Sequence, residues 1–416
     1  MRPDLVNLFR VFARIGLLSF GGPAAQIALM HTELVERHKW LEEKHFLGAL
    51  SFCMLLPGPE AMQLATYAGW RLRGVPGGLI AGLLFVLPGA VVILGLALGY
   101  AHYGQVPVIQ ALFTGIKAAV IVIVLQALLS LARRALTRRT DWALAFLAFA
   151  AMFFLSLPFP LIIAAAALTG LLLAPPAGAP PAPLPTTHRT PPRTLRTIVI
   201  WSALWAAPVL IAWIMNARFL TDIALFFSKL SIVTFGGAYA VLAYMTQAVV
   251  ETHGWLSTAQ MIDALGLAET TPGPLILVTE FVGLLAGFQQ GGTALALVAG
   301  AITLWVTFTP CFLWIFTGAP YVDALLARPR LKGALAGISA AVTGVILNLS
   351  IWFALHVLFG TVTRGEFGRI PQLDSFQPLS AALTVLAGVL LLWLRLPMTV
   401  GLALMAATAG VVHLVT

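Results

Sequence analysis

FGGPAAQIALMHTELVERHKWL, residues 20–41, recurs as FGGAYAVLAYMTQAVVETHGWL, residues 235–256. The same offset places Pro57-Gly58-Pro59 on Pro272-Gly273-Pro274 without a gap. About 16 of the 40 paired positions are identical, which is too many for chance and indicates an ancestral duplication. Because Gly pairs and Pro break helices, these two motifs mark the points where each copy interrupts its helices.

The composition is that of a membrane protein. Of the 416 residues, 60% are hydrophobic and 9% are charged, and the mean hydropathy is +0.96. Soluble domains carry about 25% charged residues, so this chain could not cover itself in water. Apolar runs near the ~20 residues that a helix needs to cross a bilayer occupy residues 76–100, 106–131, 198–215, 293–316, 335–358 and 380–394. Two shorter runs, residues 142–157 and 161–173, predict a thin hairpin.

Several classes of protein are disfavoured. Cys53 and Cys311, the two cysteines, lie in apolar segments without metal-site spacing, so neither a disulfide framework nor a zinc site is expected. The net charge of +9 comes from cations clustered in loops, where they orient the chain and meet anionic lipid rather than nucleic acid. The sequence has no Walker-type phosphate loop, so ATP is not expected as the direct energy source. No cofactor is expected.

The distribution of cations predicts the topology. Arg71 and Arg73 precede the span at residues 76–100, and the loop near His102 has no Lys, Arg, Asp or Glu. Four arginines follow the next span: Arg133, Arg134, Arg138 and Arg139. Because cytoplasmic loops are enriched in Lys and Arg, both basic ends are expected in the cytoplasm. The predicted parts are a first transporter repeat at 1–174, a Pro/Ala-rich cytoplasmic linker at 175–197, an extra transmembrane helix at 198–218 and a second repeat at 219–416.

The extra helix is expected to invert the second repeat, because charge changes sides between the copies. Arg37 of the first copy corresponds to Thr252, and the neutral loop near His102 corresponds to a basic loop that contains Arg328, Arg330 and Lys332. Such an exchange is typical of inverted repeats. The fold class that we predict is an all-α polytopic membrane protein with two homologous inverted-topology repeats and broken or re-entrant helices. The loop with Arg364 and Arg369 is placed outside by this topology, against the rule.

The glycine and proline motifs divide segments that are too long for one crossing. Residues 5–37 break at Phe20-Gly21-Gly22-Pro23, and residues 41–71 break at Pro57-Gly58-Pro59. Two half-helices in each segment would keep both of its ends in the cytoplasm and place the tip near the midplane. The inverted copy would bring its tips from the other side, so the four tips are predicted to meet. Unwound helices that span the membrane are the alternative.

These tips predict an oxyanion site. A half-helix starts after each motif, so its unpaired N–H groups and positive dipole end face the meeting point, and glycine lets an oxygen approach the backbone. Helix N-termini of this kind bind anions. The alternative is that the motifs are kinks that pack closely against neighbouring helices. The predicted substrate-binding residues are Ser19, Phe20, Gly21, Gly22, Pro23, Gln26, Pro57, Gly58, Pro59, Gln63, Lys117, Thr234, Phe235, Gly236, Gly237, Thr270, Thr271, Pro272, Gly273 and Pro274.

The duplicated motifs resemble a known family. Phe-Gly-Gly-Pro near the N-terminus and Pro57-Gly58-Pro59-Glu60, both repeated about 215 residues later, are similar to the chromate ion transporter family in its long, duplicated form. The resemblance implies an inner-membrane exporter of chromate that confers resistance, with sulfate as the chemically similar competitor. The second copy departs from the pattern at Ala238, for Pro23, and at Leu275, for Glu60, so the two halves need not contribute equally.

Charged residues inside apolar segments are candidates for the pathway. Lys117 lies in the middle of a span, where an ammonium is costly and functional by default. It is expected to attract the dianion or to pair with a carboxylate such as Glu60 or Glu280, and the alternative is a lysine that reaches the membrane boundary. Arg14 and Lys229 occupy equivalent positions just before the glycine tips. They either border the anion pathway or anchor at a lipid interface.

Three acids and two amides complete the predicted pathway or coupling residues. Glu60 follows the first Pro-Gly-Pro tip, while Glu269 and Glu280 flank the second. Each is either a proton-coupling or capping carboxylate or part of a structural ion pair. Gln126 and Asn348 align when the register shifts by seven residues, and a buried amide in both copies would bridge helices or line the path.

The function predicted from these features is secondary transport. The chain is expected to export chromate across the bacterial inner membrane by alternating access, and a sulfate carrier or an oxyanion channel is the nearest alternative. An intramembrane enzyme is the remote alternative, because no catalytic grouping stands out. A homodimer is among the oligomeric states left open.

Overall fold

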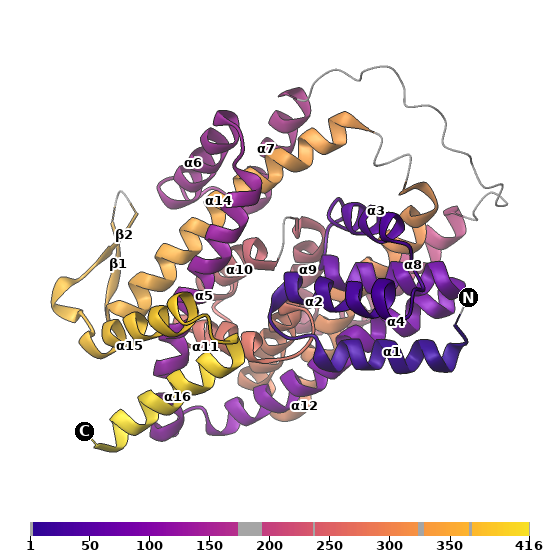
Figure 1. Cartoon of the computed structure of the whole chain (residues 1–416). Helices are drawn as coiled ribbons and strands as arrows, with labels where there is room; N and C mark the ends of the chain where they lie inside the picture. The colour runs from indigo at the N-terminus through magenta and orange to yellow at the C-terminus, as the bar shows by residue number, and fades with distance from the viewer. Residues whose placement is uncertain (1–2, 174–193, 236–237, 323–327, 366–367, 416) are drawn as a thin grey trace. The chain divides into compact units, whose positions relative to one another are not determined.

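The computed structural model describes residues 3–173, 194–235, 238–322, 328–365 and 368–415, and it is almost entirely helical (Figure 1). The first half contains α1 (Leu5–Leu18), α2 (Gly22–His31), η1 (Thr32–Arg37), α3 (Glu43–Cys53), α4 (Glu60–Tyr103), α5 (Pro107–Ala135), α6 (Arg139–Phe153) and α7 (Phe159–Leu173). Residues 174–193, most of the predicted linker, lie outside the described residues, as do Gly236 and Gly237.

The second half begins with α8 (Thr194–Ile214), α9 (Arg218–Val233), α10 (Ala238–Gln247), η2 (Ala248–Thr252), α11 (Thr258–Thr270), η3 (Leu275–Leu277), α12 (Val278–Gly318) and η4 (Ala319–Tyr321). It continues with α14 (Pro329–Leu358), η5 (Leu373–Ser375), α15 (Pro378–Gly388), η6 (Val389–Trp393) and α16 (Met398–Val415). Between α14 and η5, β1 (Val362–Gly365) and β2 (Gly368–Pro371) pair antiparallel, with Val362 opposite Pro371.

The all-helical membrane prediction is confirmed. Among the described residues, 6 helical stretches are long and apolar enough to cross a membrane. Five of them overlap the first five predicted runs almost completely, whereas the run at 380–394 forms the shorter helix α15 and the turn η6. The sixth stretch is α16, which none of the predicted runs includes although it is as apolar as the stretch in α14. The predicted thin hairpin corresponds to α6 and α7, with 15 residues each.

Helix α4 is two antiparallel arms rather than one rod. Its backbone leaves helical geometry at Arg73 and at Gly74, where φ is +67°. Beyond this turn the chain runs back, so that a Cβ on Gly69 would lie 2.2 Å from the carbonyl oxygen of Gly77 and 2.6 Å from the Cβ of Ala81. Glycines therefore allow the two arms to touch through their backbones. The first arm, from Glu60 to the turn, is about 20 Å long at about 1.5 Å per residue, too short to cross about 30 Å of hydrocarbon.

Helix α12 repeats this arrangement in the second copy. Its turn lies at Gly291 and Gly292, where φ of Gly292 is +71°. A Cβ on Gly287 would lie 2.7 Å from the Leu295 carbonyl oxygen, and one on Gly283 would lie 2.3 Å from the Thr303 hydroxyl. The duplication is therefore visible in the backbone beyond the region where the two sequences align.

The helix ends that precede the Pro-Gly-Pro motifs also match. The π-helical turns η1 and η2 both close through a residue with positive φ, +51° at Lys39 and +61° at Gly254. The next tryptophan, Trp40 or Trp255, donates its backbone N–H to the carbonyl six residues earlier, at 2.8 and 2.9 Å. This bond spans one residue more than the 6→1 bond of a Schellman cap, because it follows a π-helical turn. The recurring His-x-Trp sequence thus ends a helix.

The described residues form two compact units, each of which takes segments from both halves of the sequence. Unit 1 consists of those within Met1–Leu94, Leu168–Ala238 and Thr271–Leu335, and unit 2 of those within Gly95–Ala167, Tyr239–Thr270 and Ala336–Thr416. In unit 1, α8 packs on α12, with the Trp201 ring stacked on Phe312. In unit 2, α5 packs against α15 and α16 around a core that includes Ala118, Ile123 and Met405.

Candidate functional site

In unit 1 the two kinds of break meet in a reciprocal way. The backbone N–H of Gly273, in the second Pro-Gly-Pro loop, donates to the carbonyl of Ser19 at 2.8 Å. The N–H of Gly58, in the first loop, donates to the carbonyl of Thr234, also at 2.8 Å. The Pro-Gly-Pro loop of each repeat therefore donates a hydrogen bond to the helix end of the other repeat. A two-fold axis produces this reciprocal pattern. The predicted meeting of the tips is realised as these two crossed pairs.

Helix termination explains why these carbonyls are available. The last carbonyls of a helix lack an intrahelical partner, and Ser19 and Thr234 follow the last residues of α1 and α9. Their hydroxyls donate back to the carbonyls of Ile15 and Leu230, each at 2.6 Å. These two hydroxyl protons are thus used within the helices and are not available to a ligand.

Left-handed glycines open the start of α2. Gly21 and Gly22 have φ of +87° and +80°, Pro23 lies in the first turn, and no side chain caps the helix. A Cβ added to Gly22 would meet nothing within 4 Å. The start of α2 therefore combines unpaired N–H groups and a positive dipole end with open space, as binding of an oxyanion requires.

The Pro-Gly-Pro glycines are confined more tightly. Gly58 has φ of +117°, and a Cβ there would lie 2.8 Å from Gln63 Nε2 and 3.0 Å from Cys311 Sγ. Gly273 has φ of +87°. In the second arm of α4, a Cβ on Gly89 would come within 2.1 Å of the Pro272 carbonyl oxygen. Glycine is thus needed both in the loops and in the helix that supports one of them.

Two buried glutamines hold the loops. Gln26 Nε2 donates to the Gly273 carbonyl at 2.7 Å and lies 3.4 Å from the Ser19 carbonyl, while Gln63 Nε2 donates to the Pro57 carbonyl at 2.7 Å. The Oε1 atoms of both glutamines are buried without a hydrogen-bond partner in the described part of the chain. Gln26 thus links the first helix break to the second repeat's loop.

The remaining predicted loop residues differ in exposure and contacts. Phe20 is 38% exposed, and its N–H bonds the Leu18 carbonyl, just as the N–H of Phe235 bonds that of Val233. Pro59 immediately precedes α4, in whose first turn Glu60 is half-buried. The Thr270 hydroxyl donates to the Leu267 carbonyl at 2.7 Å, Thr271 is buried, and Pro274 is the N-cap of η3.

Unit 2 contains a charged group around Lys117. Its Nζ lies 3.2 Å from Asp263 Oδ1, and the Tyr100 hydroxyl donates to Asp263 Oδ2 at 2.8 Å. The Asp263 side chain is only 6% exposed. The expected partners Glu60 and Glu280 were the wrong choice of carboxylate. Asp263 was overlooked, although an acid inside the apolar sequence of α11 is itself a signal of function.

The two acids that flank the second loop have different surroundings. In unit 2, Glu269 is buried and accepts a hydrogen bond of 2.7 Å from the Tyr239 hydroxyl. In unit 1, Glu280 is 3% exposed, and its Oε2 has no hydrogen-bond partner among the described residues. A buried carboxyl with one oxygen that lacks such a partner is a candidate proton carrier, so Glu280 matches the predicted coupling role better than Glu269.

The matched cations Arg14 and Lys229 are both exposed, but Arg14 belongs to a cluster on unit 1. Its Nε lies 3.6 Å from the buried Glu33 carboxylate, which Arg37 and His38 also approach, at 3.2 and 3.5 Å. A cavity of about 730 Å³ adjoins this cluster, with Arg10 on its wall. The second copy has Ala248 at the position of Glu33, so the cluster is not duplicated.

The two amides also differ. Asn348 in α14 is 7% exposed, whereas Gln126 in α5 is exposed beside Arg133 and Arg134. The expectation of a buried amide in both copies therefore holds only for Asn348. Gln126 is followed by two arginines at the end of α5, where the helix becomes polar and its side chains are exposed.

The chain is apolar, helical and duplicated, and the loop of each repeat bonds the broken helix of the other. These features define a polytopic membrane transport protein built from two repeats. The sequence matches the family described as chromate transporter over residues 6–171 and again over residues 221–412. The chain belongs to the chromate transporter family.

Relatives of similar length support this assignment. A probable chromate transport protein of Synechococcus elongatus is 31% identical over 93% of this chain and 95% of its own length. The chromate transport protein of Cupriavidus metallidurans is 32% identical over 84% of this chain and 82% of its own. That of Pseudomonas aeruginosa is also 32% identical, over 82% and 79%. No solved structure matches the chain.

Proposed function

We propose that this protein exports chromate from the cytoplasm across the bacterial inner membrane by alternating access and thereby confers resistance. The observation that carries the proposal is the open, uncapped start of α2 beside the crossed loops. Backbone N–H groups at such a helix end favour a dianion with oxygen at its surface. Sulfate has the same shape and charge, so we expect it to compete.

The energetics favour export. An inside-negative potential drives a leaving anion by about 2.3 kcal/mol per charge per 100 mV, so a dianion needs no further energy source. The Arg14 and Glu33 cluster, with three arginines on the wall of its cavity, would concentrate the anion at the cytoplasmic entrance. Proton exchange through Glu280 is compatible with this scheme but is not required by it.

Everted membrane vesicles test the proposal, because export then appears as uptake. We expect radiolabelled chromate to accumulate with the potential, to be displaced by sulfate, and to be reduced at least tenfold by Gly22→Leu. Gly74→Leu is the matched control, since Gly74 also has positive φ and open space for a Cβ but lies at the turn of α4. Absence of chromate flux would overturn the substrate, and equal losses in both variants would overturn the role of the α2 start.

A further inference from the structure

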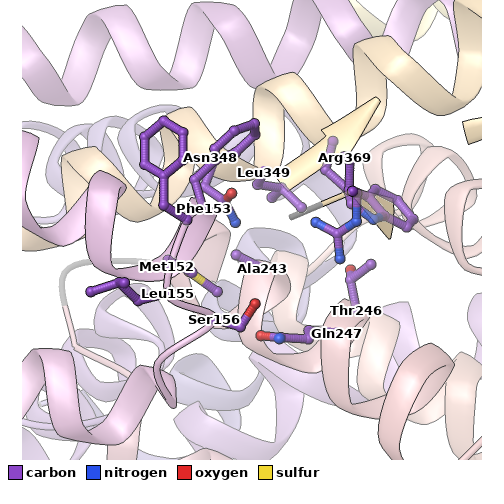
Figure 2. A pocket seen from close by; sticks show the side chains of 13 residues that line it. Met152, Phe153, Leu155, Ser156, Ala243, Thr246, Gln247, Asn348, Leu349 and Arg369 are labelled. Carbon is purple, nitrogen blue, oxygen red and sulfur yellow. The ribbon is translucent and has the colours of Figure 1, made fainter. Parts of the chain in front are cut away.

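Unit 2 contains a partly open cavity whose lining includes Asn348 but none of the other candidate residues described above. Its volume is about 200 Å³, and it lies between the turn that joins α6 to α7, α10 and α14, with β1 and β2 at its edge (Figure 2). Polar lining is provided by Ser156, Thr246, Gln247, Asn348 and Arg369. Phe153, Phe154 and Trp352 supply much of the apolar wall.

The polar groups of this cavity point toward one another. Figure 2 shows the Asn348 amide, the Ser156 hydroxyl and the Gln247 amide around Ala243, with the Arg369 guanidinium facing them beside Thr246. Thr246 is 2% exposed and Asn348 is 7% exposed. Thr246 Oγ1 and Asn348 Oδ1 are buried and find no hydrogen-bond partner within the described residues. Buried polar atoms of this kind call for a ligand or for ordered water.

The donors suit an oxyanion. Arg369 contacts the Glu251 carboxylate through Nη2, and a guanidinium has five N–H donors, so others remain to reach into the cavity. An arginine, amides and hydroxyls within an aromatic wall can bind a tetrahedral anion by several hydrogen bonds while removing part of its water. Since a water molecule takes about 30 Å³ of liquid, the cavity has room for such an anion and several waters.

We infer that this cavity is a second binding site for the transported oxyanion, held by Arg369 and by the side-chain amide of Asn348. The inference rests on the proposed function for the class of ligand. It also explains the basic loop that the predicted topology places outside against the positive-inside rule, because Arg369 of that loop would serve the anion rather than set orientation. In that topology the cavity lies toward the outside of the membrane, where an exported anion is released.

Cysteine protection tests the site directly. Cys53 and Cys311 are buried, so Ser156→Cys introduces the one accessible thiol into the full-length protein. We expect a cationic methanethiosulfonate to modify it, and sulfate to slow the modification at least fivefold at saturation. Sulfate is the probe because chromate would oxidise the thiol. Adding Arg369→Gln should remove the protection, while Leu373→Cys, at a residue 76% exposed, should show none.

Each result separates this site from the proposed function. Unprotected Ser156→Cys, protection that survives Arg369→Gln, or equal protection of Leu373→Cys would overturn the site, even if the parent protein moves chromate. Protection without chromate flux in parent vesicles would support the site and overturn the substrate. If the new thiol does not react, Asn348→Asp decides: the added carboxylate should raise the KM for chromate at least tenfold, and an unchanged KM would overturn the site.

Discussion

At the scale of single residues, the pair of Lys117 and Asp263 decides between a structural and a transport role. The two groups neutralise each other inside unit 2, with the Tyr100 hydroxyl as a third partner. Taking one charge from a buried pair leaves the other uncompensated, at a cost of about 3–5 kcal/mol. Removing both charges leaves no such penalty, so stability and transport can be measured apart.

We therefore expect Lys117→Met to lower thermal stability in detergent and to abolish chromate flux, and the double variant Lys117→Met/Asp263→Asn to recover the stability alone. The measurement combines thermal unfolding with vesicle uptake on the same preparations. Recovery of flux together with stability would show that the pair serves only the fold.

A second prediction concerns Gln26, which is 1% exposed and bonds the Gly273 carbonyl from the other repeat. Gln26→Leu removes that donor and should destabilise the protein by about 1–3 kcal/mol, the cost of a buried polar group left unsatisfied. Chromate flux should fall with it, because the loop is no longer held. Gln289→Leu, at an exposed glutamine, is the control, and similar unfolding temperatures for the two variants would contradict the role of Gln26.

Single residues also show where sequence reasoning stops. Ser19 and Thr234 were recognisable because their motifs recur, and the structure places both at crossed loops. Asp263 has no counterpart motif, and its contact with Lys117 joins distant parts of the chain. Nor does any pattern state that the hydroxyls of Ser19 and Thr234 would bond inside their own helices. Helix breaks can be predicted from the local sequence, whereas the partners of side chains such as Asp263 depend on tertiary packing.

At the scale of helices, the close approach of α4 to the second Pro-Gly-Pro loop gives a prediction. Gly89→Ala would place a methyl group 2.1 Å from the Pro272 carbonyl oxygen, where backbone must shift. Overpacking of this kind costs about 1–3 kcal/mol, and it should displace the loop and reduce chromate flux. Gly95→Ala in the same helix has nothing within 4 Å and should stabilise by about 0.5–1 kcal/mol. Unfolding temperature and flux that change alike in both variants would rule out the contact.

The helix-scale predictions succeeded where length or a motif carried the information. Residues 41–71 were expected to break at Pro57-Gly58-Pro59, and α3 and α4 do separate there. The reversal inside α4 at Gly74 was anticipated only through its neighbouring arginines, whereas its equivalent at Gly292 is displaced by three residues from the repeat offset. Helix α16 lies outside every predicted run although it is as apolar as the span in α14, so that omission does not reflect a lack of signal in the sequence.

At the scale of the whole chain, inverted repeats predict which residues face which side. Lys39 and Gln290 are both exposed, and each lies near the end of a half-helix of its repeat. Lys39→Cys should react with a membrane-impermeant thiol reagent only from the cytoplasm, and Gln290→Cys only from outside. The buried Cys53 and Cys311 provide the silent background. Labelling of both new cysteines from one face would mean that the repeats run parallel, while the crossed loops would remain.

The crossed loops also determine the order in which contacts form during biosynthesis. Gln26 and its acceptor Gly273 are 247 residues apart. At about 5–20 residues per second on the ribosome, Gly273 is synthesised roughly 12–50 s after Gln26. During that time the polar ends of α1 and α2 reside in the bilayer without their native partner, where unsatisfied backbone is costly. A newly made first repeat is thus an incomplete protein that depends on the insertion machinery, or on water at its tip, until the second repeat arrives.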